Sequence, residues 1–132
     1  MAETGMPAKP RILVVDDSSL VRLYYRAALE KAGFVVEQAI NGIEAMEKVL
    51  SEAFDLVIVD VNMPRMDGFT FLRALRTAAG DVSTLPALMI STESEIQDIA
   101  EARAAGANFY LVKPVAEAEL VSHVSVLTGV SR

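Results

Sequence analysis

Five short apolar runs divide the chain, and stretches with apolar residues at helical spacing separate them. Buried parallel strands are near-continuous apolar runs, whereas helices that cover a sheet carry an apolar stripe every three to four positions. The runs predict strands over Arg11–Asp16, Phe34–Ala39, Phe54–Asp60, Leu85–Ser91 and Asn108–Val112. Helices are expected to begin near Ser18 or Ser19, Asn41-Gly42, Asp67, Glu93 and Val115.

This alternation predicts an α/β fold, a doubly wound five-stranded parallel sheet with helices on both faces. The flavodoxin-like strand order 2-1-3-4-5 is the leading choice for five strands. A chain of 132 residues has room for one such domain. Residues 1–10 are expected to form a flexible tail and residues 11–129 the domain, with no effector domain after it.

Polar side chains stand directly after four of the apolar runs. They are Asp16-Asp17, Asp60, Ser91 and Lys113. Because parallel strands have their carboxyl ends on one edge of a sheet, we expect three carboxylates, a hydroxyl and an ammonium group to converge there.

Three carboxylates at a sheet edge repel one another, so a cation or a proton must neutralise them. Oxygen ligands without any cysteine thiolate favour Mg²⁺. The metal and Lys113 would then bind a phosphoryl group, with one carboxylate left as the nucleophile. We assign Asp60 as nucleophile because it follows its strand singly. Asp17 is the main metal ligand, Asp16 acts partly through water, and Ser91 is a candidate to bond a phosphoryl oxygen.

The acidic balance of the chain limits its partners. A net charge of −6 argues against non-specific binding to nucleic acid, which requires a basic face. No apolar stretch approaches a membrane span, and the first ten residues lack the apolar segment of a secretory signal. A cytoplasmic protein is therefore expected, acting neither on membranes nor on nucleic acid.

The motifs resemble the receiver domain of two-component response regulators. They are Asp16-Asp17, the run from Val59 to Gly68, Ser91, and Lys113-Pro114, and the likeness covers about Arg11 to Thr128. Each motif alone is weak, but their order and spacing are specific. The single-domain, CheY-like chemotaxis type is the nearest class.

The resemblance implies a phosphoprotein that takes its phosphoryl group on Asp60 from a histidine kinase or phosphotransfer protein. Mg²⁺ would be held by Asp17, Asp60 and the backbone carbonyl of Asn62. Ser91 and Tyr110 would form the switch pair. The Lys113-Pro114 bond would be cis, as is typical of the family.

The resemblance also implies an output surface made by the fourth helix, the fifth strand and the fifth helix. Its candidate contacts are Ile96, Ile99, Arg103, Tyr110 and His123. Asn62 and Glu93 would tune dephosphorylation. The resemblance implies a switch in phosphorelay signalling whose chemistry is limited to its own phosphorylation and dephosphorylation, rather than an enzyme. Ser91 stands where the family more commonly has threonine. Thr92 stands where an alanine is frequent, and its bulk would restrict access to the phosphoryl group, so the lifetime of the phosphorylated state is left open. A monomer is expected, with dimerisation on phosphorylation left open.

Three other functions compete with this interpretation. A phosphate-independent scaffold module is the main alternative, although such a module would be expected to lose one of the acidic residues. A nucleotide-binding Rossmann domain requires a glycine-rich turn after the first strand, where this chain reads Asp16-Asp17-Ser18-Ser19. A haloacid-dehalogenase-like phosphatase places a second aspartate where Asn62 stands.

Phe109, beside Tyr110, is expected to lie in the core.

Overall fold

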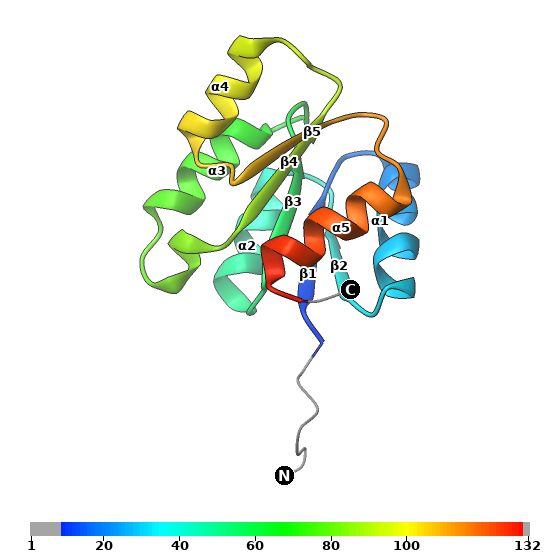
Figure 1. Cartoon of the computed structure of the whole chain (residues 1–132). Helices are drawn as coiled ribbons and strands as arrows, with labels where there is room; N and C mark the ends of the chain where they lie inside the picture. Colours follow the sequence, from blue (N-terminus) through cyan, green and yellow to red (C-terminus); the bar gives the residue numbers. More distant parts are fainter. Residues whose placement is uncertain (1–8, 131–132) are drawn as a thin grey trace.

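A computed structural model describes residues 9–130 as one five-stranded parallel sheet between two layers of helices (Figure 1). The strands are β1 (Arg11–Val15), β2 (Val35–Ala39), β3 (Leu56–Asp60), β4 (Ala87–Ser91) and β5 (Phe109–Val112). They follow the order β2-β1-β3-β4-β5, and every neighbouring pair is parallel. The predicted fold class and strand order are confirmed.

Four helices and one 3₁₀ turn connect the strands, and a fifth helix follows β5. They are α1 (Ser19–Lys31), α2 (Gly42–Ser51), α3 (Gly68–Thr77), the 3₁₀ turn η1 (Asp81–Thr84), α4 (Ile96–Ala105) and α5 (Glu117–Thr128). The side chains of Ser18, Asn41 and Asp67 each accept a hydrogen bond from a backbone N–H of the following first turn. These side-chain caps satisfy N–H groups that have no partner inside a helix, and they explain where α1, α2 and α3 begin.

The helices divide between the two faces of the sheet and make two separate cores (Figure 1). On one face, α1 and α5 pack over the sheet around Leu29 and Leu120. On the other face, α2, α3 and α4 pack around Phe71 and Leu75. The central strand β3 is buried along its whole length, which is why its sequence is continuously apolar up to Asp60.

Strand register aligns the carboxyl ends of the strands at one edge. Asp60 pairs with Ile90 in register, and Ser91 pairs with Val112. Asp16 follows the last residue of β1, and its backbone N–H donates to the carbonyl of Ala39 at 3.2 Å. The polar residues that follow these strands therefore start from the same edge.

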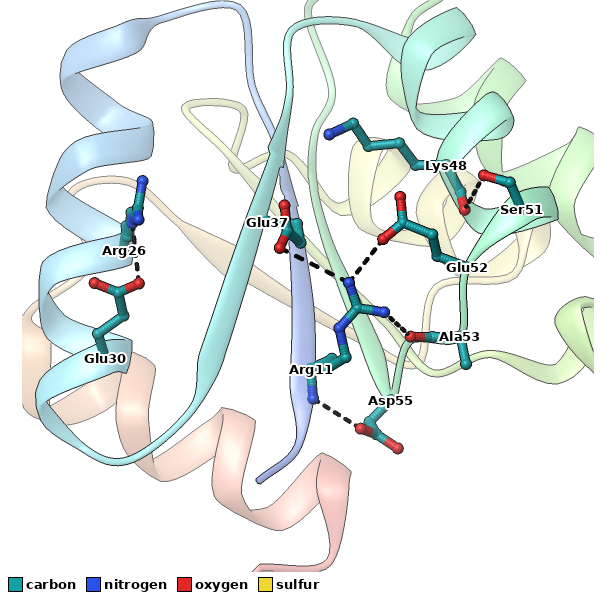
Figure 2. A network of polar contacts seen from close by, with 9 residues as sticks. All are labelled: Arg11, Arg26, Glu30, Glu37, Lys48, Ser51, Glu52, Ala53 and Asp55. Atoms are coloured by element: carbon teal, nitrogen blue, oxygen red, sulfur yellow. Dashed lines mark hydrogen bonds and ion pairs between the residues drawn. The ribbon is translucent and has the colours of Figure 1, made fainter. Parts of the chain in front are cut away.

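Arg11 lies at the opposite edge of the sheet, where it makes a network of polar contacts (Figure 2). Its backbone N–H donates to Asp55 at 2.8 Å, and its guanidinium donates to the carbonyl of Ala53 at 2.6 Å. The same guanidinium pairs with Glu52 at 2.7 Å and with Glu37 at 3.8 Å. One side chain at the start of β1 thus contacts β2 and the segment that leads into β3.

Arg76 joins the loops that surround β4. Its guanidinium donates to the carbonyls of Gly106, Leu85 and Ser83 at distances between 2.7 and 3.1 Å. It also donates to the side-chain oxygen of Asn108 at 3.1 Å. Burial lowers the pKa of Arg76, yet a guanidinium stays charged at any physiological pH. The side chain links α3 to the segments that lead into β4 and β5.

Two expectations near β5 were wrong. Helix α4 begins at Ile96, not near Glu93, because the backbone of Glu93 is used in contacts with Ser91 and Tyr110. Phe109 is 45% exposed rather than core, since it lies on the edge strand with the ring of His123 against it at 4.6 Å.

Candidate functional site

Three carboxylates meet at the carboxyl edge of the sheet. Asp16 and Asp60 are buried, with 2% and 8% of their surface exposed, whereas Asp17 is exposed. Oxygen atoms of the three groups lie within 4.8 Å of one another. The backbone N–H of Ser18 donates to one oxygen of Asp16 at 2.9 Å and so helps to orient this carboxylate.

Lys113 extends from the loop after β5 into this cluster. Its ammonium nitrogen lies 3.3 Å from Asp16 Oδ2 and 3.3 Å from Asp60 Oδ1. Its backbone N–H donates to the carbonyl of Ser91 at 2.7 Å, and the Lys113-Pro114 peptide bond is cis. The structure thus brings together Asp16, Asp17, Asp60 and Lys113, and the backbone of Lys113 bonds that of Ser91.

Burial and neighbouring charges shift the pKa values of Asp60 and Lys113. Burial, followed by the negative charge of Asp16, raises the pKa of Asp60 to about 6, and Lys113 offsets only part of this. Burial alone would lower the pKa of Lys113, but the charges of Asp60 and Asp16 outweigh it and raise that pKa. One ammonium group therefore does not neutralise the cluster.

A short chain of hydrogen bonds leads from Ser91, at the end of β4, to Tyr110 on β5. Ser91 is fully buried at the end of β4, and its hydroxyl accepts the backbone N–H of Glu93 at 3.1 Å. The hydroxyl of Tyr110 donates to the carbonyl of the same Glu93 at 2.7 Å. Burial raises the pKa of Tyr110, so its hydroxyl remains a donor at neutral pH. The backbone of Glu93 connects the two residues expected to form a switch.

The loop after β3 places further candidates close to Asp60. Asn62 lies two residues beyond Asp60 and is exposed, as is Glu93 after β4. Gly68 opens α3 directly behind Asp60, and its N–H donates to the carbonyl of Val61 at 2.9 Å. A side chain at Gly68 would collide with the Asp60 carbonyl, so this close approach requires glycine.

The candidate partner residues lie on α4, β5 and α5. Ile96 is 85% exposed at the start of α4. A groove of about 240 Å³ runs between α4 and β5 and is lined in part by Ile99, Arg103 and Tyr110. His123, on α5, donates a hydrogen bond from Nδ1 to the carbonyl of Glu119 at 2.8 Å. These residues share one side of the molecule, at the β5 edge of the sheet.

Two contacts of α1 with the site were missed in the sequence. Arg22 donates to the carbonyl of Asp16 at 2.6 Å, and the hydroxyl of Tyr24 donates to the carbonyl of Val115 at 3.0 Å. The second contact joins residues 91 positions apart. Periodicity marks Tyr24 only as one more residue of an amphipathic helix, so no sequence signal reveals its partner.

The donor set fits a hard divalent cation. All three clustered side chains are carboxylates, which are the ligands that Mg²⁺ prefers, and no cysteine is present in the chain. Asp17 is exposed, which leaves the cluster open to solvent on that side and suits an ion that keeps several waters. A cation here would relieve the repulsion that raises the pKa of Asp60.

Comparisons with known proteins agree with this site. The family model described as "Response regulator receiver domain" matches residues 12–125. "Transcriptional regulatory protein PrrA" of Mycobacterium leprae is 40% identical over 125 residues, which are 95% of this chain and 52% of that protein. "Response regulator MprA" of Mycobacterium ulcerans is 39% identical over 117 residues, 89% of this chain and 49% of that protein. The chain spans about half the length of these curated relatives.

Solved structures match over nearly their whole length. Chemotaxis protein CheY4 of Vibrio cholerae is 37% identical with a TM-score of 0.85, over 91% of this chain and 99% of that one. A putative response regulator from Chloroflexus aurantiacus is 32% identical with a TM-score of 0.86, over 92% of this chain and 99% of that one.

The fold and the acidic site define a signalling domain of the doubly wound α/β class. More narrowly, the chain belongs to the response regulator receiver domain family. Receiver domains are signalling switches rather than enzymes that turn over a diffusible substrate. None of the helices in the described part of the chain combines the length and apolar character of a membrane span.

Proposed function

We propose that this chain is a response regulator that accepts a phosphoryl group on Asp60 from a histidine kinase or a phosphotransfer protein. The observation that carries the proposal is the contact of Lys113 with both Asp16 and Asp60, at 3.3 Å each, inside a cluster of three carboxylates. An ammonium group held beside a buried carboxylate is suited to bind the oxygens of a phosphoryl group.

The residues that would hold Mg²⁺ are Asp16, Asp17, Asp60 and the backbone carbonyl of Asn62. The three carboxylates fit this ion by their chemistry and spacing, and Asn62 lies on the loop that follows β3. When bound, the ion supplies positive charge that neutralises the carboxylates and the phosphoryl oxygens.

Phosphoryl transfer to Asp60 requires a free carboxylate oxygen. An oxygen of Asp60 forms a bond to phosphorus, and the bond from phosphorus to the donor histidine nitrogen breaks, with the electron pair left on that nitrogen. Lys113 binds a phosphoryl oxygen and stabilises the charge of the transition state. Asp60 with a pKa of about 6 is mostly ionised at neutral pH and is therefore ready to attack.

The switch acts through Ser91 and Tyr110. Phosphorylation places an acceptor oxygen near Ser91, and the Ser91 hydroxyl turns to donate to it. This ends the bond between the Ser91 oxygen and the Glu93 N–H, and the loop that holds Tyr110 through the Glu93 carbonyl is released. The face of α4, β5 and α5 then favours a second conformer that a protein target binds.

The chain also removes its own phosphoryl group. A water attacks phosphorus, the bond between phosphorus and the Asp60 oxygen breaks, and inorganic phosphate leaves while the carboxylate is restored. Asn62 and Glu93 are exposed beside the site and tune this step. The exposed side chain of Thr92, next to Ser91, limits the approach of water.

The output is protein signalling in the cytoplasm, of chemotaxis or phosphorelay type. Ile96, Ile99, Arg103, Tyr110 and His123 are the proposed contacts with the target. The likeness to CheY4 supports a chemotaxis-type output, whereas the likeness to PrrA supports control of transcription in a longer protein.

An Asp60→Asn variant tests the proposal. We expect the natural chain to take a labelled phosphoryl group from a phosphorylated histidine kinase only when Mg²⁺ is present, and the variant to take none. Asp81→Asn, at an exposed aspartate in η1, is the matched control and should be labelled fully. Undiminished Mg²⁺-dependent labelling of Asp60→Asn would rule out the assignment. A natural chain that takes no label would instead favour a phosphate-independent scaffold.

A further inference from the structure

The loop that carries Lys113 is tied to its surroundings at two points. At one end, the backbone N–H of Lys113 donates to the carbonyl of Ser91 at 2.7 Å. At the other end, the carbonyl of Val115 accepts the hydroxyl of Tyr24 at 3.0 Å. The first bond anchors the loop to the sheet, and the second anchors it to α1. The position of the Lys113 side chain depends on both.

A groove of about 520 Å³ lies between α1 and this loop. Leu20, which lines it, is 78% exposed, so the groove is open to solvent. The Tyr24 side chain reaches across the groove to Val115, and its own surface is 45% exposed. That bond crosses the groove and ties the loop to α1.

We infer that Tyr24 is a positioning residue for Lys113, holding the loop after β5 against α1 so that the ammonium group stays beside Asp16 and Asp60. The inference rests on the proposed phosphoryl transfer to Asp60. Tyr24 touches none of the reacting atoms in this arrangement, since its hydroxyl is bonded to Val115. It acts on the site only through the backbone of the loop.

The contact distances make Lys113 sensitive to such a displacement. Its ammonium nitrogen lies 3.3 Å from an oxygen of each carboxylate, near the outer limit of a hydrogen bond. A loop that moves away from α1 would lengthen both contacts together. Small misplacements of a charged group that stabilises a transition state lower the rate strongly.

The next residue provides a matched control. Tyr25 lines the same groove, and its ring centroid lies 5.8 Å from that of Tyr24. The structure gives the Tyr25 hydroxyl no hydrogen bond to any residue between 9 and 130, whereas Tyr24 bonds Val115. Tyr25→Phe therefore removes a phenol hydroxyl from the same helix and groove without removing the tie to the loop.

The experiment measures phosphorylation of the full chain by acetyl phosphate with saturating Mg²⁺. Acetyl phosphate is a small acyl phosphate that needs no protein docking, so a loss of rate reports on the site itself. We expect Tyr24→Phe to lower the second-order rate constant roughly threefold to tenfold, the range that follows from loss of one hydrogen bond. Tyr25→Phe should stay within about twofold of the natural chain.

A double-mutant cycle with Lys113→Ala separates positioning from a general loss of structure. If Tyr24 acts through Lys113, Tyr24→Phe causes no further loss of rate in the Lys113→Ala background. An equal loss in both backgrounds, or an equal loss in Tyr25→Phe, would overturn the inference.

Amide hydrogen exchange tests the tie independently of phosphorylation. In the metal-free protein, Tyr24→Phe should speed exchange of the Lys113 amide roughly threefold to tenfold, while Tyr25→Phe leaves it unchanged. Unchanged exchange in Tyr24→Phe would overturn the inference even if the natural chain is phosphorylated. If acetyl phosphate does not label the natural chain, the proposed function fails, and the exchange result still decides whether the tie exists.

Discussion

The carboxyl group of Asp60 lies where its charge is disfavoured. It is buried at the end of the central strand, with the carboxylate of Asp16 close by, and Lys113 supplies one positive charge for the pair. The resulting pKa of about 6 means that ionisation of Asp60 costs free energy in the folded state. The fold therefore loses some stability by placing a carboxylate at this position.

The stability of the metal-free protein should therefore depend on pH through Asp60. Its pKa is raised from 3.8 to about 6 on folding, so its contribution is fully present below the unfolded value and lost as pH rises through about 6. Asp60→Asn lacks this titration. We expect the natural chain to lose roughly 2 to 3 kcal/mol relative to the variant between about pH 4 and pH 8.

Urea unfolding with a chelator present measures this difference. Subtracting the unfolding free energy of the variant from that of the natural chain at each pH cancels the titration of the other groups that both share. A difference in unfolding free energy that stays constant across the range would contradict the proposed burial and repulsion at Asp60.

At the scale of elements, the order of strands was predictable and their junctions were not. The apolar runs ending at Val15 and Asp60 mark buried strands because both faces of the sheet are covered. The caps at Ser18 and Asp67 were predictable because each bonds its own helix. Contacts within a few positions leave a sequence signal.

Junctions between distant segments leave no such signal. The late start of α4 at Ile96 depends on Tyr110, which occupies the carbonyl of Glu93 from 17 positions away. The exposure of Phe109 depends on how α5 covers the edge strand, which alternation along β5 does not encode. The same holds for the site. The convergence of the strand ends was predictable from the topology, whereas the contact of Tyr24 with Val115 was visible only in the folded structure.

Arg76 offers a test of such a junction. Arg76→Met removes hydrogen bonds to the carbonyls of Gly106 and Leu85 and leaves these groups without their partner. We expect a loss of roughly 2 to 3 kcal/mol in the free energy of unfolding. Arg73→Met is the control on the same helix, because the only polar contact of the Arg73 guanidinium with residues 9–130 is an exposed ion pair with Glu101 at 3.4 Å. That pair should contribute less than about 0.5 kcal/mol.

Urea or thermal unfolding of the two variants decides the point. Equal losses for Arg76→Met and Arg73→Met would mean that the carbonyl contacts of Arg76 add nothing to stability. In that case the loops around β4 would be held by apolar packing alone.

At the scale of the whole molecule, the end of β4 and the proposed output face are joined through the backbone of Glu93. The hydroxyl of Ser91 accepts a hydrogen bond from the N–H of Glu93, and the hydroxyl of Tyr110 donates one to the carbonyl of Glu93. Arg11 and its polar contacts lie at the opposite edge of the sheet, away from this chain of bonds. A change at the site can therefore reach β5 and α4 while the sheet stays fixed.

Ser91→Ala should separate phosphorylation from signalling. The variant keeps the carboxylates and Lys113, so it should still bind beryllofluoride, a phosphoryl analogue, in the presence of Mg²⁺. It lacks the hydroxyl that leaves Glu93 for the phosphoryl group, so we expect no change in tyrosine fluorescence on binding, whereas the natural chain responds.

The chain has no tryptophan, and Tyr110→Phe identifies which of the three tyrosines gives the signal. Ser94→Ala, at an exposed serine of the same loop, should respond fully. A full response from Ser91→Ala would mean that the site reaches β5 by another route, because the hydroxyl that bonds the N–H of Glu93 would then be dispensable.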